Sequence, residues 1–86
     1  MELSSRHQAT LEAIYENPTR SDIRWASIEG LFRALGATLK QGKGSRVRVK
    51  LSGQKAVFHR PHPEPDTDRG AVKSVRRFLF TAGVLL

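Results

Sequence analysis

Two histidines follow a run of cations in the stretch GKGSRVRVKLSGQKAVFHRPHP, which covers residues 42–63. They are His59 and His62, and an unperturbed imidazole exchanges protons near neutral pH, as a general acid or base must. Residues 39–59 contain no Asp or Glu. Histidine beside permanent cations suits chemistry at a phosphodiester, because the cations stabilise the negative charge of the transition state. The stretch therefore predicts a polyanion site with His59 and His62 as candidate catalytic residues.

The HxxH spacing of the two histidines also raises the alternative of a metal site. In a helix this spacing can place two ligands side by side, but Pro61 forces an extended turn here. The acids that follow lie in the segment RPHPEPDTD, whose three prolines predict an irregular loop. The ligand set for zinc is then incomplete and has no defined geometry. We therefore predict no metal site and no other cofactor.

The bulk composition also favours a polyanionic partner. The 86 residues include 15 Lys and Arg against 8 Asp and Glu, a formal net charge of +7. On so short a chain this charge favours nucleic acid or an acidic protein as the partner. Cysteine is absent, and the sequence has neither a signal-peptide core nor an apolar run that could span a bilayer. These features predict a cytoplasmic protein that does not associate with membranes.

Three segments repeat apolar residues at three- and four-residue steps, as amphipathic helices do. The first covers residues 5–17. The second begins near Trp25 and ends at Gly36, which suits a left-handed C-terminal conformation. The third covers residues 69–82, and Asp68 is placed to cap its first turn. All three helices are expected to bury one face.

Three strands are predicted between the second and third helices, at residues 37–41, 45–51 and 54–59. The turns GKG and SG that join them are too short for parallel crossovers, so the sheet is antiparallel. The predicted fold class is α+β, with the order helix, three-stranded antiparallel sheet, helix and an extra N-terminal helix. Residues 1–20 are expected to form the N-terminal helix and linker, and residues 21–86 the α-β-β-β-α domain.

Alternation along the strands places the cations on one side of the sheet. Arg46, Arg48 and Lys50 point away from the apolar residues between them. If Phe58 enters the core, His59 joins the cationic face. The predicted core comprises Phe32, Leu35, Val49, Phe58, Val75 and Leu79, with Phe78 at its margin. The candidate RNA-binding residues are Lys43, Arg46, Arg48, Lys50, Lys55 and Arg60.

A solvated sheet face is the alternative to nucleic-acid binding, because outward Lys and Arg also protect strand edges. That alternative explains the presence of charge but not its single sign, so nucleic-acid contact is favoured. The third helix adds four cations whose role stays open between contact with the same ligand and a solvated helix face. They are Arg69, Lys73, Arg76 and Arg77.

The motifs LFRALGA, GKGSRVRV, VFHRPHP and DRGAVKSVRRFLFTAGV, in this order, resemble HicA-type toxins over residues 23–84. The resemblance implies the fold of double-stranded-RNA-binding domains and a ribosome-independent mRNA endonuclease. It also implies a HicB-like antitoxin partner in a bacterial type II toxin–antitoxin module. HicA toxins usually carry a catalytic histidine directly after the G-S turn, where this chain has Arg46. His62 matches the second family histidine, and His59 is additional.

Three functions follow as alternatives. The first is a toxin that binds mRNA and cleaves it without a metal. The second is a non-catalytic relative that binds RNA, and the third is a protein-interaction module whose basic face meets an acidic partner. If expression stops cell growth, cleavage of RNA in the same cells distinguishes the first function from the second. Failure to bind RNA at low salt favours the third function.

Overall fold

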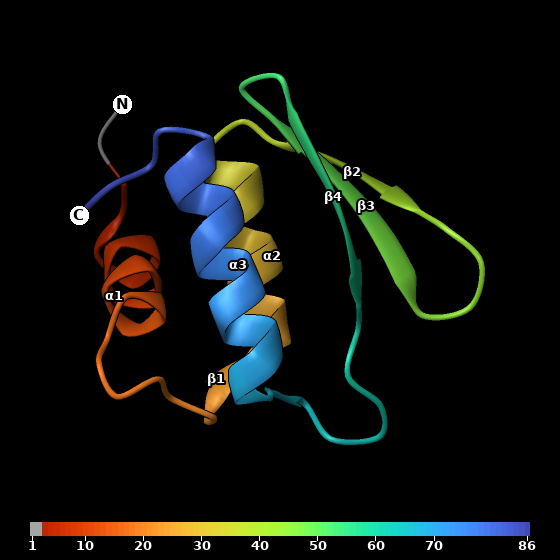
Figure 1. The fold of residues 1–86 in the computed structure, drawn as a ribbon, viewed down its shortest axis with the longest axis horizontal. Helices are drawn as coiled ribbons and strands as arrows, with labels where there is room; N and C mark the ends of the chain where they lie inside the picture. Colours follow the sequence, from red (N-terminus) through yellow and green to blue (C-terminus); the bar gives the residue numbers. More distant parts are fainter. Residues whose placement is uncertain (1–2) are drawn as a thin grey trace.

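The computed structural model describes residues 3–86, and Figure 1 shows its elements along the chain. They are α1 (Ser5–Ile14), β1 (Ile23–Arg24), α2 (Trp25–Ala34), β2 (Thr38–Gln41), β3 (Arg46–Leu51), β4 (Gln54–His59), β5 (Asp66–Thr67) and α3 (Arg69–Thr81). The main sheet has the order β2-β3-β4, and both strand pairs are antiparallel. The predicted α+β fold, with its likeness to double-stranded-RNA-binding domains, is confirmed.

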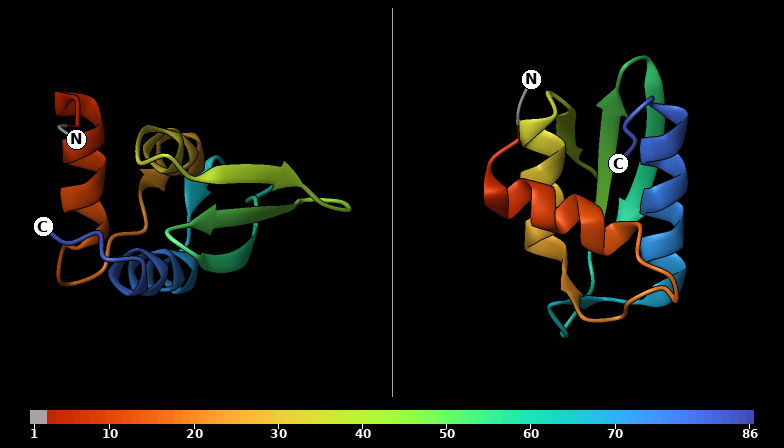
Figure 2. Two further views of the ribbon diagram at one scale, coloured as in Figure 1. Left: turned by 90° about the horizontal axis from the view of Figure 1, so that it is seen from above. Right: turned by 90° about the vertical axis from the view of Figure 1, so that its left-hand side faces the viewer.

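The elements form three layers, which Figure 2 shows from above. The sheet is one layer, the pair α2 and α3 covers its inner face, and α1 packs on the far side of this helix pair. The outer face of the sheet carries no helix (Figure 1). An antiparallel sheet tolerates this arrangement, because its residues alternate between a buried face and a wet one.

Local sequence signals set the boundaries of the main elements. The Asp68 side chain accepts a hydrogen bond from the backbone N–H of Ala71 at 2.8 Å, which caps α3 as predicted. Gly36 has a φ of +90° directly after α2, a conformation that costs a residue without Cβ little. Ser52 and Gly53 both have positive φ in the tight turn between β3 and β4. The predicted helix end and hairpin turn are therefore confirmed.

Four aromatic rings from three elements form the centre of the core. Phe58 of β4 stacks on Phe32 of α2 at 5.8 Å between ring centroids, and Phe78 of α3 meets both rings edge-on. Trp25 completes the cluster against Phe58. Such offset and edge-on contacts stabilise a core beyond the area that they bury. The predicted marginal place of Phe78 is wrong, because α3 turns this ring onto both aromatic neighbours.

The rest of the predicted core is confirmed with one exception. Val49, Val75 and Leu79 are almost completely buried, as are Phe32 and Phe58. Leu35 is only half-buried, and it packs against the core from the side. It follows the last helical residue of α2, where the chain turns away through Gly36 toward the sheet.

A short strand pair, β1 with β5, was not predicted. Ile23 pairs with Thr67 and Arg24 with Asp66, and the Trp25 N–H donates to the carbonyl of Pro65 at 3.0 Å. The end of the segment expected to be an irregular loop is therefore a strand. Two residues are too few for any alternation to be visible in the sequence, and burial of Ile23 and Thr67 fixes the pairing instead.

The helix α1 shares the core of the remaining fold. Leu11 and Ile14 are buried in the same apolar cluster as the aromatic rings. Two arginines of α3 hold the end of α1 and the linker after it: Arg76 donates from Nε to the Ile14 carbonyl at 2.9 Å, and Arg69 to the Thr19 carbonyl at 3.1 Å. Both guanidinium groups thus form intramolecular hydrogen bonds, with Arg69 exposed and Arg76 half-buried. The boundary at residue 20 stays a prediction.

Candidate nucleic-acid interface

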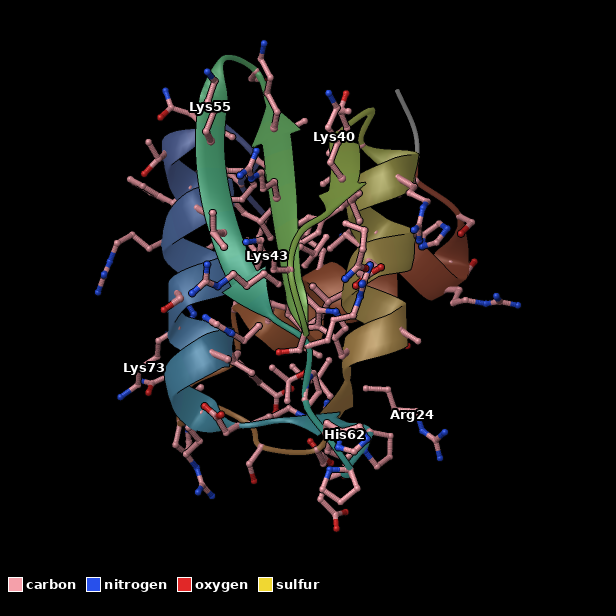
Figure 3. All side chains as sticks on the ribbon, turned by 90° about the vertical axis from the view of Figure 1, so that its right-hand side faces the viewer. Arg24, Lys40, Lys43, Lys55, His62 and Lys73 are labelled. Atoms are coloured by element: carbon pink, nitrogen blue, oxygen red, sulfur yellow. The ribbon has the colours of Figure 1, made fainter. Side chains whose placement is uncertain are left out.

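The outer face of the sheet carries a field of cations. On β3, three exposed cations alternate with three buried apolar residues. Cations of the neighbouring strands and of the β2–β3 turn extend this field, and Figure 3 looks onto it with Lys40 and Lys55 labelled on the two edge strands. We call this surface the outer cation face, and it comprises Lys40, Lys43, Arg46, Arg48, Lys50, Lys55 and His59.

The strand register places like charges directly opposite one another. Lys50 of β3 pairs with Lys55 of β4, and Lys40 of β2 pairs with Arg48 of β3. No cation of this face forms an ion pair with a carboxylate among residues 3–86. Like charges in opposite positions destabilise an antiparallel pair. The outer cation face therefore opposes folding slightly and would be relieved by a bound polyanion.

His59 lies in a shallow hollow of this face. It is the cross-strand partner of Arg46 and is exposed at the end of β4. The apolar Val57, which is 55% exposed, lies two residues before it on the same face. The hollow is lined by Gly42, Lys43, Arg46, Arg48, Val57 and His59. A phosphate in this hollow would meet a proton carrier and three permanent cations together.

His62 lies in a different hollow, next to the first. Figure 3 shows it in the loop beyond the end of the strands. It lines this hollow together with Gly44, Ser45, Arg60 and Pro61. The turn between β2 and β3 contributes residues to both hollows and separates them. The structure thus brings His59 and Arg46 together and places His62 on the other side of the turn.

Arg60, a predicted RNA-binding residue, is partly buried and bonds to other side chains of the protein. Its Nε donates to Oε2 of Glu29 at 2.6 Å, and its Nη2 donates to Oε1 at 3.3 Å. Glu29 lies on α2, is 7% exposed, and also accepts a hydrogen bond from the Trp25 indole. Burial raises the pKa of the Glu29 carboxyl, but the hydrogen bonds and the charge of Arg60 outweigh it and lower the pKa. The same bonds raise the pKa of Arg60.

This ion pair continues into the turn beside the outer cation face. Arg60 Nη1 donates to the Gln41 side-chain oxygen, and Gln41 Nε2 donates to the carbonyls of Gly42 and Gly44 at 3.1 and 2.9 Å. The network links Glu29 on α2 to the end of β4 and to the turn that carries Lys43. It braces the end of the sheet at which Arg46 and His59 meet.

A comparison with models of known protein families identifies the family of the chain. The family described as HicA toxin of bacterial toxin-antitoxin matches residues 25–84. The chain belongs to the HicA toxin family. No curated protein and no solved structure gives a significant match. The matched range holds the whole outer cation face and the Glu29–Arg60 pair, whereas α1 lies before it.

Within this HicA toxin, sequence reasoning missed Glu29 and Gln41 as site residues. Glu29 stands between Ile28 and Phe32 on the apolar stripe of α2, four residues after Trp25. An acid on an apolar stripe is a usable signal, because a buried carboxylate needs a cationic partner. Gln41 offers no comparable signal, since strand ends often carry polar residues.

Two properties of the described residues bear on other classes of site. Among residues 3–86, no three His, Asp or Glu side chains gather closely enough to hold a metal ion. None of the helices in that range combines the length and the apolar character needed to cross a bilayer.

Proposed function

We propose that this chain is an RNA-binding toxin that cleaves mRNA without a metal and is neutralised by a HicB-like antitoxin in the cytoplasm. One observation carries the proposal: the register sets like cations opposite each other across an exposed sheet face. Folding alone gives no reason for this arrangement, whereas a phosphate backbone does. Membership of the HicA toxin family supports the same conclusion.

RNA would lie across the outer cation face. Lys43, Arg46 and Arg48 surround the hollow of His59, and Lys50 and Lys55 continue the surface toward the opposite end of the strands. Side chains such as these position a backbone without selecting its sequence. Arg60 would act on RNA by holding the turn in place, because its guanidinium is already bonded to Glu29.

Cleavage would follow the usual transesterification of RNA. His59 would take the proton of a ribose 2′-hydroxyl, whose oxygen forms a bond to phosphorus while the bond to the 5′-oxygen breaks. Arg46 and Arg48 would stabilise the added negative charge on the phosphorus-bound oxygens. The products would be a 2′,3′-cyclic phosphate and a 5′-hydroxyl end. Only a side chain that can lose a proton near neutrality serves as the base, which excludes arginine.

His62 would be the second proton carrier. It lies across the turn from His59, so an RNA bent over that turn would place its leaving 5′-oxygen toward the second hollow. The imidazolium of His62 would donate the proton that the leaving oxygen requires. Water can also supply this proton, so we expect His62 to contribute less than His59.

A HicB-like antitoxin would neutralise the toxin through the same charges. A partner that presents carboxylates to the outer cation face would satisfy cations that have no acidic partner among residues 3–86. Such a partner would exclude RNA by occupying its site. The reading frame next to this gene is expected to encode it.

The test is cleavage of single-stranded RNA by the purified protein, with the His59→Ala variant as its comparison. We expect cleavage in the presence of a chelator, 2′,3′-cyclic phosphate ends, and suppression by the co-expressed neighbouring protein. Binding without any cleavage by the parental protein would remove the enzymatic part of the proposal.

A non-catalytic RNA-binding module is the second candidate, and Arg46 favours it. This residue follows the G-S turn, where the family resemblance places a catalytic histidine. A guanidinium there binds phosphate but cannot move a proton at any working pH. Growth arrest on expression without RNA cleavage in the same cells would establish this function.

A further inference from the structure

A second exposed surface lies on α3, on the side of this helix toward the C-terminal end of α1. Three residues of α3 share one stripe at steps of four and three residues, namely Lys73, Arg77 and Phe80. All three are exposed, and Phe80 is 63% exposed. We call these residues the α3 patch. Figure 3 shows Lys73 projecting from α3 at the side of the sheet.

The patch borders a shallow pocket with an aromatic and cationic lining. The lining residues are Tyr15, Lys73, Arg76, Arg77 and Phe80. The Tyr15 hydroxyl donates to the Val84 carbonyl at 2.8 Å, and Arg76 donates to the carbonyls of Ile14 and Glu16. Tyr15 and Arg76 are therefore held in place by hydrogen bonds. The exposed ring of Phe80 is the apolar part of the pocket that a ligand could contact.

The charges of this surface have one sign. The helix α3 contains no Asp or Glu. Glu16, whose carbonyl accepts a bond from Arg76, has its carboxylate in an ion pair with Arg20 at 3.2 Å. Neither Lys73 nor Arg77 forms a side-chain hydrogen bond or ion pair with any residue in 3–86. Of the four α3 cations, two hold the linker and two are available to a ligand.

We propose that the α3 patch is a second contact site for single-stranded RNA, in which a base stacks on Phe80 and its phosphates meet Lys73 and Arg77. An aromatic face beside cations is the combination that single strands recognise without sequence preference. This inference rests on the proposed function, because the RNA held at α3 is the continuation of the strand on the outer cation face.

The position of the patch fits one continuous RNA path. The edge strand β4 carries Lys55 and His59 on the outer cation face and packs against α3 on the inner side. A strand that leaves the hollow of His59 over this edge crosses α3 and then reaches the patch, which lies on the side of α3 toward the end of α1, where Tyr15 lines the pocket. The patch would thus hold RNA at a distance from the cleaved bond and raise affinity for longer strands, without touching the reacting phosphate.

Fluorescence anisotropy with labelled single-stranded RNA tests the proposal. Phe80→Ala should weaken binding of an oligonucleotide of about 12 nucleotides by about 5- to 150-fold, because one stacked base is lost. An oligonucleotide of about 4 nucleotides, which fills only the outer cation face, should bind to Phe80→Ala as tightly as to the parent. Phe80→Trp should bind at least as tightly as the parent, and RNA should quench the new indole fluorescence.

Charge removal gives a second, independent measurement. Replacing Lys73 and Arg77 with Ala should lower the slope of log K against log salt by about 0.7 per lost contact. Two matched controls remove equivalent groups elsewhere: Leu86→Ala for an exposed apolar residue and Arg6→Ala for an exposed cation on α1. Both controls should bind RNA like the parent. Thermal unfolding should be unchanged in all variants, because the substituted side chains are exposed.

The outcomes separate this inference from the proposed function. Failure of the parental protein to bind RNA would overturn both. Weakened binding after Arg46→Ala and Arg48→Ala, with no effect of the Phe80 and Lys73 variants, would overturn only the α3 patch. Loss of antitoxin binding in Phe80→Ala, with RNA binding intact, would assign the patch to a protein partner and overturn it equally.

Discussion

The two faces of the β2-β3-β4 sheet use alternate residues of the same strands in opposite ways. On the inner face, the ring centroid of Phe58 lies 5.8 Å from those of three other aromatic rings. On the outer face, the next residue, His59, is exposed beside Arg46. The inner side chains are fixed by close packing, whereas the outer ones contribute little to folding. Folding and recognition can therefore be altered separately in adjacent residues.

The arginines show the same contrast within one residue type. Arg46 and Arg48 have no carboxylate partner among residues 3–86, whereas Arg60 is bonded to Glu29 and Arg76 to linker carbonyls. A guanidinium carries enough directed donors to act as an internal brace or as a phosphate ligand. Its surroundings in the fold decide which role it has. An arginine in a basic stretch of the sequence is therefore not assigned to phosphate binding by its position in the sequence alone.

The largest expected effect comes from removing a core ring on the inner face of the sheet. Phe58→Ala should lower the free energy of unfolding by about 3–5 kcal/mol, because it leaves a cavity inside the aromatic cluster. Urea unfolding measures the change. The control is Val57→Ala on the same strand, which should cost far less because Val57 is 55% exposed. Equal losses in the two variants would contradict the assignment of the faces.

The next effect concerns the outer face and its chemistry. His59→Ala should slow RNA cleavage by about 10²-fold or more, because the proposed base is lost, and should leave stability and RNA affinity largely intact. His62→Ala should have a smaller effect, and chelators none. Rates from gel-resolved RNA fragments measure this. A variant without either histidine that still cleaves at the parental rate would refute the assignment.

A smaller effect concerns the internal brace. Arg60→Ala should lower the free energy of unfolding by about 1–3 kcal/mol, because it leaves the buried Glu29 carboxylate without its main partner. The same variant should leave the salt dependence of RNA binding nearly unchanged, unlike loss of a phosphate contact. Gln41→Ala should loosen only the turn, which hydrogen exchange at residues 42–46 would detect.

The pH dependence of stability follows from the same pair. Interactions with Arg60 and Trp25 lower the pKa of Glu29 in the folded chain. The resulting stabilisation is present above the unfolded pKa of about 4.3 and is lost as the pH falls through the lower folded value. Acid titration of stability should therefore show a loss below about pH 4 that is reduced in Arg60→Ala. A parental curve that is flat in this range would contradict the brace.

The smallest expected effect is a change in the salt dependence of RNA binding by the outer cation face. Replacing Arg46 and Arg48 with Ala should lower the slope of log K against log salt by about 0.7 for each lost contact on single strands. Arg6→Ala on α1 removes one charge far from this face and should not alter the slope. An unchanged slope in the double variant would mean that these arginines do not touch the phosphate backbone.

Periodicity and turn chemistry determined the main fold of this chain. The spacing of Phe32 with its apolar neighbours, the alternation around Val49 and the turn at Gly53 are local signals, and each predicted its element correctly. The same alternation placed Arg46, Arg48 and Lys50 on one face, since the period of a strand is two. The order of the short motifs predicted the family, which the match over residues 25–84 confirms.

Tertiary structure alone decided which charged groups are available to a ligand. The sequence separates Glu29 from Arg60 by 31 positions and Ile14 from Arg76 by 62, so no local pattern reveals either contact. The β1–β5 pair likewise joins distant segments through two residues each. Local propensity acts over a few residues, whereas pairing of distant charges depends on how the layers pack. Packing therefore bonded Arg60 and Arg76 to other parts of the chain and left the outer cation face and the α3 patch without such partners among residues 3–86.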